Sequence, residues 1–161
     1  MSEFEETQPS YSLRLFADYY QLYLQDGEDA EDVPDDWSEQ LIEQKIAVSP
    51  GVIGISTARN MTVPVQVNLL TSKPDNDDFS NWDHVAEASL EITSSNIIVA
   101  GCSDYFPDAL HIPVLPGLYR VRVYYGELGS ISEDGLRGND HYRVVIWPEK
   151  EYRVPEILKK W

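Results

Sequence analysis

The sequence predicts a mainly β fold, a two-layer antiparallel β-sandwich with one short helix. About eight short segments favour strands, one amphipathic segment favours a helix, and turn residues separate them. Apolar residues make up 42% of the 161 residues and aromatic residues 11%, which is typical of a folded chain rather than a disordered one. A chain of this length forms one domain and buries roughly 70% of its unfolded surface.

The first half of the chain predicts a tail, strands and the helix. Residues 1–9 are acidic and polar, so we expect a flexible tail followed by a single domain over residues 10–161. The helix is expected from about residue 37 to 45, because Asp36 can cap it, Glu39 lies three positions later and Leu41 and Ile42 supply an apolar stripe. Alternation or β-branched and aromatic content predicts strands at residues 11–15, 19–24, 52–57 and 63–69.

The second half contains strands alone. We expect residues 88–92 and 97–100 to form a hairpin around the Ser94–Asn96 turn. In the strand at residues 118–124, Arg120 and Arg122 alternate with apolar residues, which predicts one buried and one solvent-facing side. Further strands are expected at residues 109–114 and 142–147, and the mixed-charge segment from residue 149 is not assigned to a strand.

Catalytic and cofactor chemistry find little support. Ser56 lies in a Gly-x-Ser-x-Ala sequence that lacks the strand-to-helix turn of a nucleophile elbow. Cys102 is the single cysteine, and we expect it to be a small buried apolar side chain rather than a nucleophile. The histidines at 84, 111 and 141 show no metal-binding spacing, residues 75–78 match only the start of a calcium loop, and no glycine-rich phosphate loop is present. We therefore expect a protein that is not an enzyme, with no catalytic residue, metal or cofactor.

Acidity is the feature most relevant to function. The formal net charge is −16, and residues 26–36 hold seven carboxylates with no Lys or Arg. Such a field repels nucleic acid and favours a basic protein partner, for which the carboxylates would replace phosphates. We expect the partner-binding residues to be Asp26, Glu28, Asp29, Glu31, Asp32, Asp35 and Asp36, with Trp37 as an apolar anchor and Asp75, Asp77 and Asp78 in a second loop.

Location and competing functions follow from the remaining features. An acidic N-terminus, a single cysteine and the lack of a long apolar run predict a cytoplasmic protein that neither binds a membrane nor contacts nucleic acid directly.

The acidic run can also serve solubility alone. One alternative is a sandwich that binds a sugar or small molecule through Tyr19, Tyr23 and Trp82, although we favour core and rim packing for the tyrosines at 19, 20 and 23. Others are an immunity protein against a toxin, or an enzyme that pairs Cys102 or Ser56 with a histidine.

Several aromatic and turn motifs occur in a recognisable order. They are Trp37 with the helix after it, Trp82-Asp83 before a strand, the turn and strand at residues 116–122, and the segment at residues 142–148. In this order the chain resembles the competence protein J family over roughly residues 13–148. The resemblance implies a shared fold and a role as inhibitor of a nuclease that acts in DNA uptake, so a nuclease is the favoured basic partner. No inhibitory residue is carried over from the family.

Overall fold

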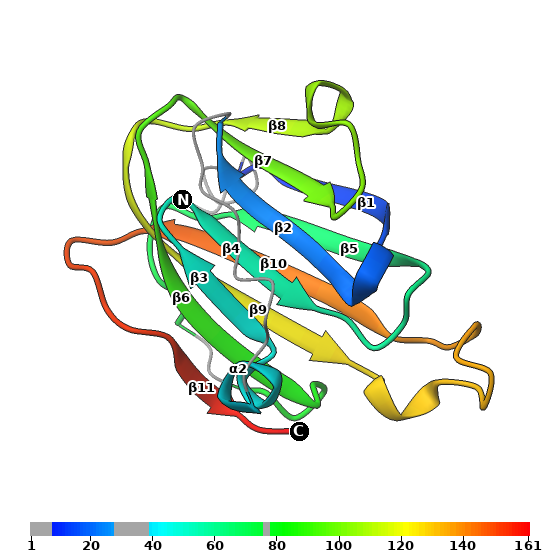
Figure 1. The fold of residues 1–161 in the computed structure, drawn as a ribbon. Helices are drawn as coiled ribbons and strands as arrows, with labels where there is room; N and C mark the ends of the chain where they lie inside the picture. Colours follow the sequence, from blue (N-terminus) through cyan, green and yellow to red (C-terminus); the bar gives the residue numbers. More distant parts are fainter. Residues whose placement is uncertain (1–7, 28–38, 76–77) are drawn as a thin grey trace.

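Two stacked β-sheets make up the molecule, as the computed structural model of residues 8–27, 39–75 and 78–161 shows (Figure 1). The strand order is β1-β5-β10-β9-β6-β11 in the six-stranded sheet and β3-β4-β2-β7-β8 in the five-stranded sheet. Among the described strands, neighbours are antiparallel except β5 and β10, which run parallel. The predicted two-layer β-sandwich is confirmed.

The strands have the following bounds. In the six-stranded sheet they are β1 (Ser10–Phe16), β5 (Thr62–Leu69), β6 (His84–Ile92), β9 (Gly117–Gly126), β10 (His141–Pro148) and β11 (Glu156–Lys159). In the five-stranded sheet they are β2 (Gln21–Asp26), β3 (Ile46–Ser49), β4 (Val52–Ser56), β7 (Asn96–Gly101) and β8 (Leu110–Pro113). The sequence did not predict β3 or β11.

The predicted helix is confirmed as α2 (Glu39–Gln44), while Trp37 and Ser38 lie outside the described residues. Three 3-10 turns accompany it: η1 (Asp18–Tyr20), η2 (Phe106–Asp108) and η3 (Leu128–Ser130). No helix in the described ranges combines the length and apolar character needed to cross a bilayer. Of the predicted tail, Gln8 and Pro9 are described, and they accept hydrogen bonds from Thr71 and Leu69.

Alternation along the strands explains the core. Val63, Val65 and Val67 of β5 face the other sheet, as do Leu22 and Leu24 of β2, and all belong to one buried cluster between the layers. A second, smaller cluster lies on the outer face of the six-stranded sheet and includes Val85, Tyr124, Val145 and Trp147. Phe79, Trp82 and Leu158 cover it, so this part of the sheet is buried on both faces.

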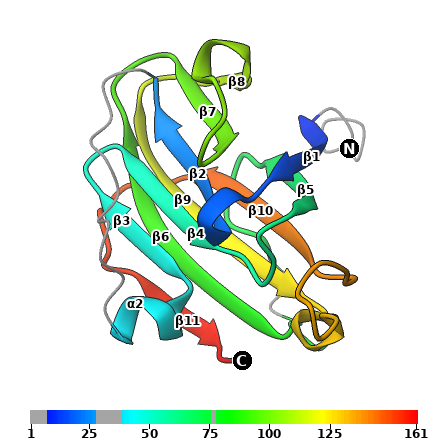
Figure 2. The same ribbon diagram turned by 45° about the vertical axis from the view of Figure 1, so that its right-hand side comes forward.

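The predicted hairpin at residues 88–100 is wrong. β6 pairs with β9 and β11, whereas β7 pairs with β2 and β8 in the opposite sheet. The residues between β6 and β7 are therefore a corner at which the chain crosses from one layer to the other (Figure 2). Polar turn residues such as Ser94 and Asn96 suit a corner as well as a hairpin, so local sequence does not separate the two.

The prediction of a solvent-facing side for β9 is also wrong. Arg120 and Arg122 are 0% and 1% exposed, and both bind Glu87 of the neighbouring β6, with nitrogen to oxygen distances of 2.8 and 2.6 Å. The guanidinium of Arg122 lies 5.4 Å from the ring of Phe79 and 5.3 Å from that of Trp147. Arg120 donates further hydrogen bonds to the carbonyls of Arg153 and Val154, because the C-terminal segment folds over this face.

Replacing Glu87 tests this buried charge cluster. E87Q leaves two desolvated guanidinium groups without their shared counter-charge, so we expect it to lower the free energy of unfolding by about 3–5 kcal/mol, measured by urea denaturation. The matched control is E156Q, because Glu156 is 53% exposed and lies 3.9 Å from Arg120. It should cost less than about 1 kcal/mol. Equal losses in the two variants would contradict a special role for Glu87.

Candidate partner-binding site

A groove opens at the end of the sandwich where β2 stops. Its volume is ≈ 770 Å³, and it lies between the β3–β4 turn of one sheet and the ends of β6 and β9 in the other. The described residues that line it include the carboxylates Asp26 and Glu91 and the ring of Tyr152, and none of these lining residues is a Lys or Arg. Glu91 is exposed at its mouth. Such a groove suits the cationic side chain of a partner.

Asp26 holds this end of the molecule together. Its side chain is 4% exposed and accepts four hydrogen bonds, from the backbone N–H and hydroxyl of both Thr93 and Ser94, at 2.6 to 2.9 Å. Burial acts to raise the pKa of Asp26, but the bonds from Ser94 and Thr93 outweigh it and hold the pKa below its ordinary value. The carboxylate therefore fixes β2 to the β6–β7 corner and is not an exposed partner-binding group.

Gly27 reinforces the same corner. Its φ is +44°, and a Cβ atom at this position would lie 2.8 Å from the Ser94 hydroxyl oxygen. A larger residue would be strained by its backbone and would push against Ser94. The chain thus enters the acidic block from a fixed point. The block itself, with Glu28, Asp29, Glu31, Asp32, Asp35, Asp36 and Trp37, lies outside the described residues, as does Asp77.

The second acidic loop lies elsewhere. Asp75 and Asp78 are exposed. Asp78 accepts a hydrogen bond from Ser80, which together with nearby Lys159 lowers its pKa. Lys159 pairs with Val85 near the start of β6, whereas Asp26 binds Thr93, just beyond the end of that strand. Eight residues of strand separate Val85 from Thr93, or roughly 26 Å. The structure therefore does not bring Asp78 and Asp26 together.

The aromatic residues considered for a ligand site also lie apart. Trp82 packs on Tyr124 at the outer face of the six-stranded sheet, with ring centroids 5.2 Å apart. Tyr23 belongs to the five-stranded sheet, where its hydroxyl donates to Gln21. Tyr19 and Tyr20 stand in the turn η1 rather than in a strand, and both are exposed. Core packing is therefore wrong for these two, and Tyr19, Tyr23 and Trp82 do not share one platform.

The η1 turn has an unusual backbone. Tyr19 has φ 57° and Tyr20 has φ 62°, so two consecutive residues with large side chains adopt the left-handed conformation. That conformation costs a non-glycine residue about 1–2 kcal/mol. The turn is held in place because Tyr20 N–H donates to the Ala17 carbonyl and Thr57 N–H donates to the Tyr20 carbonyl. Sequence reasoning missed this feature, since a Tyr-Tyr pair normally favours a strand.

The candidate nucleophiles lack a histidine partner in the described hydrogen bonds. His84 Nε2 donates to the Gln44 carbonyl while its Nδ1 accepts from Trp161 N–H, a pattern that requires a neutral ring, and burial lowers its pKa in the same sense. His111 and His141 bind the carbonyls of Phe106 and Asn139. Across residues 8–27, 39–75 and 78–161, no group of three or more His, Cys, Asp or Glu is placed to hold a metal ion.

Comparison with solved structures adds a relation of fold. The chain is similar to ComJ of Bacillus subtilis, described as an inhibitor of the DNA degrading activity of NucA, with a TM-score of 0.69 at 17% sequence identity. The match covers 89% of this chain and 99% of ComJ. The fold resembles that of ComJ. The resemblance to the competence protein J family is thereby confirmed at the level of fold.

A second solved structure has a similar fold. It is the protein of crocagin biosynthetic gene J, with a TM-score of 0.60 and 15% identity over 89% of this chain and 99% of the other. No family model and no curated protein sequence matches this chain. At such identities the likeness concerns the arrangement of the two sheets and does not place functional residues.

Replacing Asp26 tests its structural role. D26N removes the charge that accepts four hydrogen bonds, so we expect the free energy of unfolding near pH 7 to fall by about 2 kcal/mol. The pKa of Asp26 is lower in the folded state than the value of about 3.9 in the unfolded chain. Its contribution is therefore present above about pH 4 and lost as the pH falls through the folded pKa.

Urea denaturation of the unmodified protein and D26N across this pH range measures the difference, which should shrink below about pH 4. E91Q is the control, because Glu91 lines the same groove but is exposed. It should leave stability nearly unchanged. A pH-independent loss in D26N would contradict the assignment.

Proposed function

We propose that this chain is a small acidic binding protein, not an enzyme, that inhibits or neutralises a basic partner protein, with a nuclease as the favoured partner. The observation that carries the proposal is the fold shared with ComJ, an inhibitor of a nuclease, over nearly the whole of both chains. The net charge of −16 supports the same role, because it attracts basic proteins and repels nucleic acid.

The proposed mechanism is occlusion. Carboxylates of the acidic block pair with the Lys and Arg side chains that would otherwise hold nucleic acid phosphates, and Trp37 serves as an apolar anchor. The oxygens of Asp26 already accept hydrogen bonds from Thr93 and Ser94 at the β6–β7 corner. The carboxylates proposed to pair with the partner are therefore Glu28, Asp29, Glu31, Asp32, Asp35 and Asp36. Glu91, at the mouth of the groove, adds a carboxylate on a fixed strand.

The second acidic loop contributes differently. Asp75, Asp77 and Asp78 belong to a segment whose described residues lie near the opposite end of β6 from Asp26. At a separation of more than two Debye lengths in physiological salt, they steer a basic partner only weakly toward the groove. We therefore assign them to the general negative charge of the molecule, because they lie too far from Asp26 and Glu91 to pair with the same cationic group.

Charge reversal tests the mechanism. The protein should bind and inhibit at least one member of a panel of basic nucleases that includes NucA, and DNA should compete with it for the nuclease. We expect D29K/D32K to weaken binding by roughly tenfold or more, measured by calorimetry and by DNA-cleavage assays.

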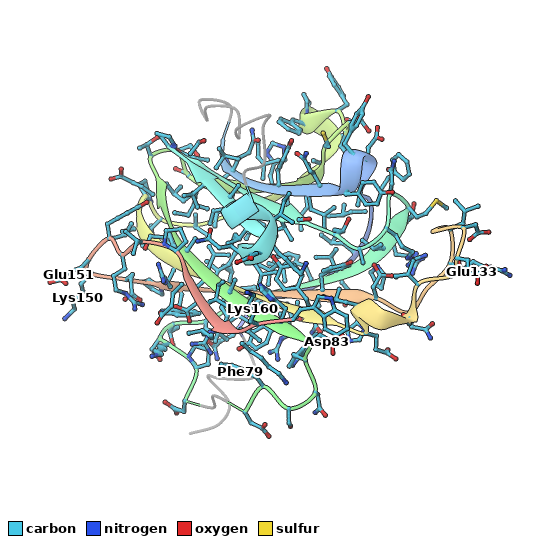
Figure 3. The ribbon with its side chains drawn as sticks, turned by 60° about the horizontal axis from the view of Figure 1, so that its bottom comes forward. Phe79, Asp83, Glu133, Lys150, Glu151 and Lys160 are labelled. Carbon is cyan, nitrogen blue, oxygen red and sulfur yellow. The ribbon has the colours of Figure 1, made fainter. Side chains whose placement is uncertain are left out.

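The control is E127K/E133K, which changes net charge by the same amount. Glu127 is 58% exposed, and Glu133 lies at the opposite end of the molecule from Glu151, whose neighbour Tyr152 lines the groove (Figure 3). It should weaken binding by no more than about threefold, through the general field alone. Equal effects in the two variants would remove the acidic block as the contact surface, and failure to bind any of the nucleases would remove the function.

A further inference from the structure

A group of exposed aromatic rings gathers at the end of the sandwich where β2 begins. Tyr19 is 69% exposed, Tyr20 51%, Phe16 41% and Tyr105 70%. We call these four residues the aromatic patch. Scattered single apolar residues are ordinary on a protein surface, but four exposed aromatic residues on the end of β1, the η1 turn and the segment before η2 are not.

Contacts of Gly101 bring the end of β7 against the end of β1. A Cβ atom on Gly101 would lie 2.1 Å from the Phe16 carbonyl oxygen and 3.4 Å from the carboxylate of Asp104. Asp104 in turn accepts a hydrogen bond from Gly101 N–H at 2.8 Å, and Tyr105 follows it directly. Both ribbon views place η1 beside the end of β7 (Figures 1 and 2). The end of β7 thus packs against the end of β1, and because Leu22 pairs with Gly101, the segment after β7 starts beside the η1 turn.

The rings are presented on a fixed backbone. Tyr19 and Tyr20 hold positive φ angles that glycine adopts readily and tyrosine avoids, and neither residue is buried. Core packing therefore does not account for tyrosine at these positions, whereas an exposed binding role does. Hydrogen bonds to Ala17 and from Thr57 anchor the turn. A rigid tyrosine pair loses little conformational entropy on binding, as in the contact residues of many interfaces.

The charge around the aromatic patch selects its partner. Residues 16–23 and 101–109 contain Asp18, Asp104 and Asp108 and no Lys or Arg, while Arg14 is exposed on the same face of β1 as Phe16. Exposed rings beside carboxylates form a surface on which a guanidinium can stack while it pairs with an acid. We propose that the aromatic patch is a docking surface for arginine side chains of a basic partner protein. The identity of that partner as a basic protein rests on the proposed function, but the residues of the aromatic patch are not those of the acidic block.

Binding of capped octa-arginine and octa-lysine peptides at physiological salt tests the proposal, with affinities from calorimetry and positions from NMR shifts of the tyrosine rings. We expect octa-arginine to bind more tightly than octa-lysine and to shift the rings of Tyr19, Tyr20 and Tyr105. Y19G/Y20G should weaken octa-arginine binding by at least about fivefold and abolish the preference over octa-lysine. Glycine suits both positive φ angles, so this variant should stay folded, which its thermal unfolding will show.

A second variant and two controls complete the design. Y105S should also weaken octa-arginine binding, whereas L115S/V154S, which removes two exposed apolar side chains elsewhere, should not. D29K/D32K should keep the ring shifts and the arginine preference, so loss of the acidic-block mechanism is distinguishable from loss of this one. Unchanged octa-arginine affinity in Y19G/Y20G would overturn the proposal. So would ring shifts caused by cellohexaose and not by octa-arginine, which would assign the aromatic patch to sugars.

Discussion

The position of β2 at the centre of the five-stranded sheet is the constraint on which both candidate surfaces depend. β4 and β7 flank β2 on its two edges, and its two ends are fixed by hydrogen bonds outside the sheet. At the start, Thr57 binds the carbonyl of Tyr20, and at the end Thr93 and Ser94 bind the carboxylate of Asp26. The aromatic patch and the groove therefore stand at opposite ends of one rigid strand of six residues, roughly 20 Å apart. An interface of ordinary size, about 800 Å² per partner, can span both.

The carboxylates of this chain fall into two groups, one buried between or against the sheets and one exposed. Glu87 and Asp26 are buried, and each is surrounded by donors that satisfy its oxygens. These carboxylates stabilise the fold and are not available to a partner. Exposed acids such as Glu91, Asp75 and Asp108 lie on turns and strand ends, and they form no salt bridge with a buried cation among the described residues. Net charge alone does not separate the two groups, whereas the hydrogen bonds of each carboxylate do.

Periodicity in the sequence was enough to predict β1, β5, β9 and β10, because an alternating apolar face is a local property. The sheet to which each strand belongs was not predictable in this way. Asp26 binds Thr93 from 67 residues away, and Arg120 is covered by a C-terminal segment whose mixed charges resemble a solvated tail. The acids of residues 26–36 were recognised as one block, but the burial of its first member depends on that distant corner. The positive φ angles of Tyr19 and Tyr20 had no sequence signal, since glycine or asparagine is the usual residue there.

Carboxylates and aromatic rings would act on different steps of association with a basic partner. Exposed negative charge acts over distances near the Debye length of about 8 Å, so it accelerates encounter and is weakened by salt. Stacked rings act only in contact, so they slow dissociation and respond less to salt. The net charge of −16 therefore attracts a basic partner to the whole surface, whereas a small rigid contact fixes the orientation in which that partner binds. The η1 turn meets that second need, because its backbone is anchored while its rings remain in solvent.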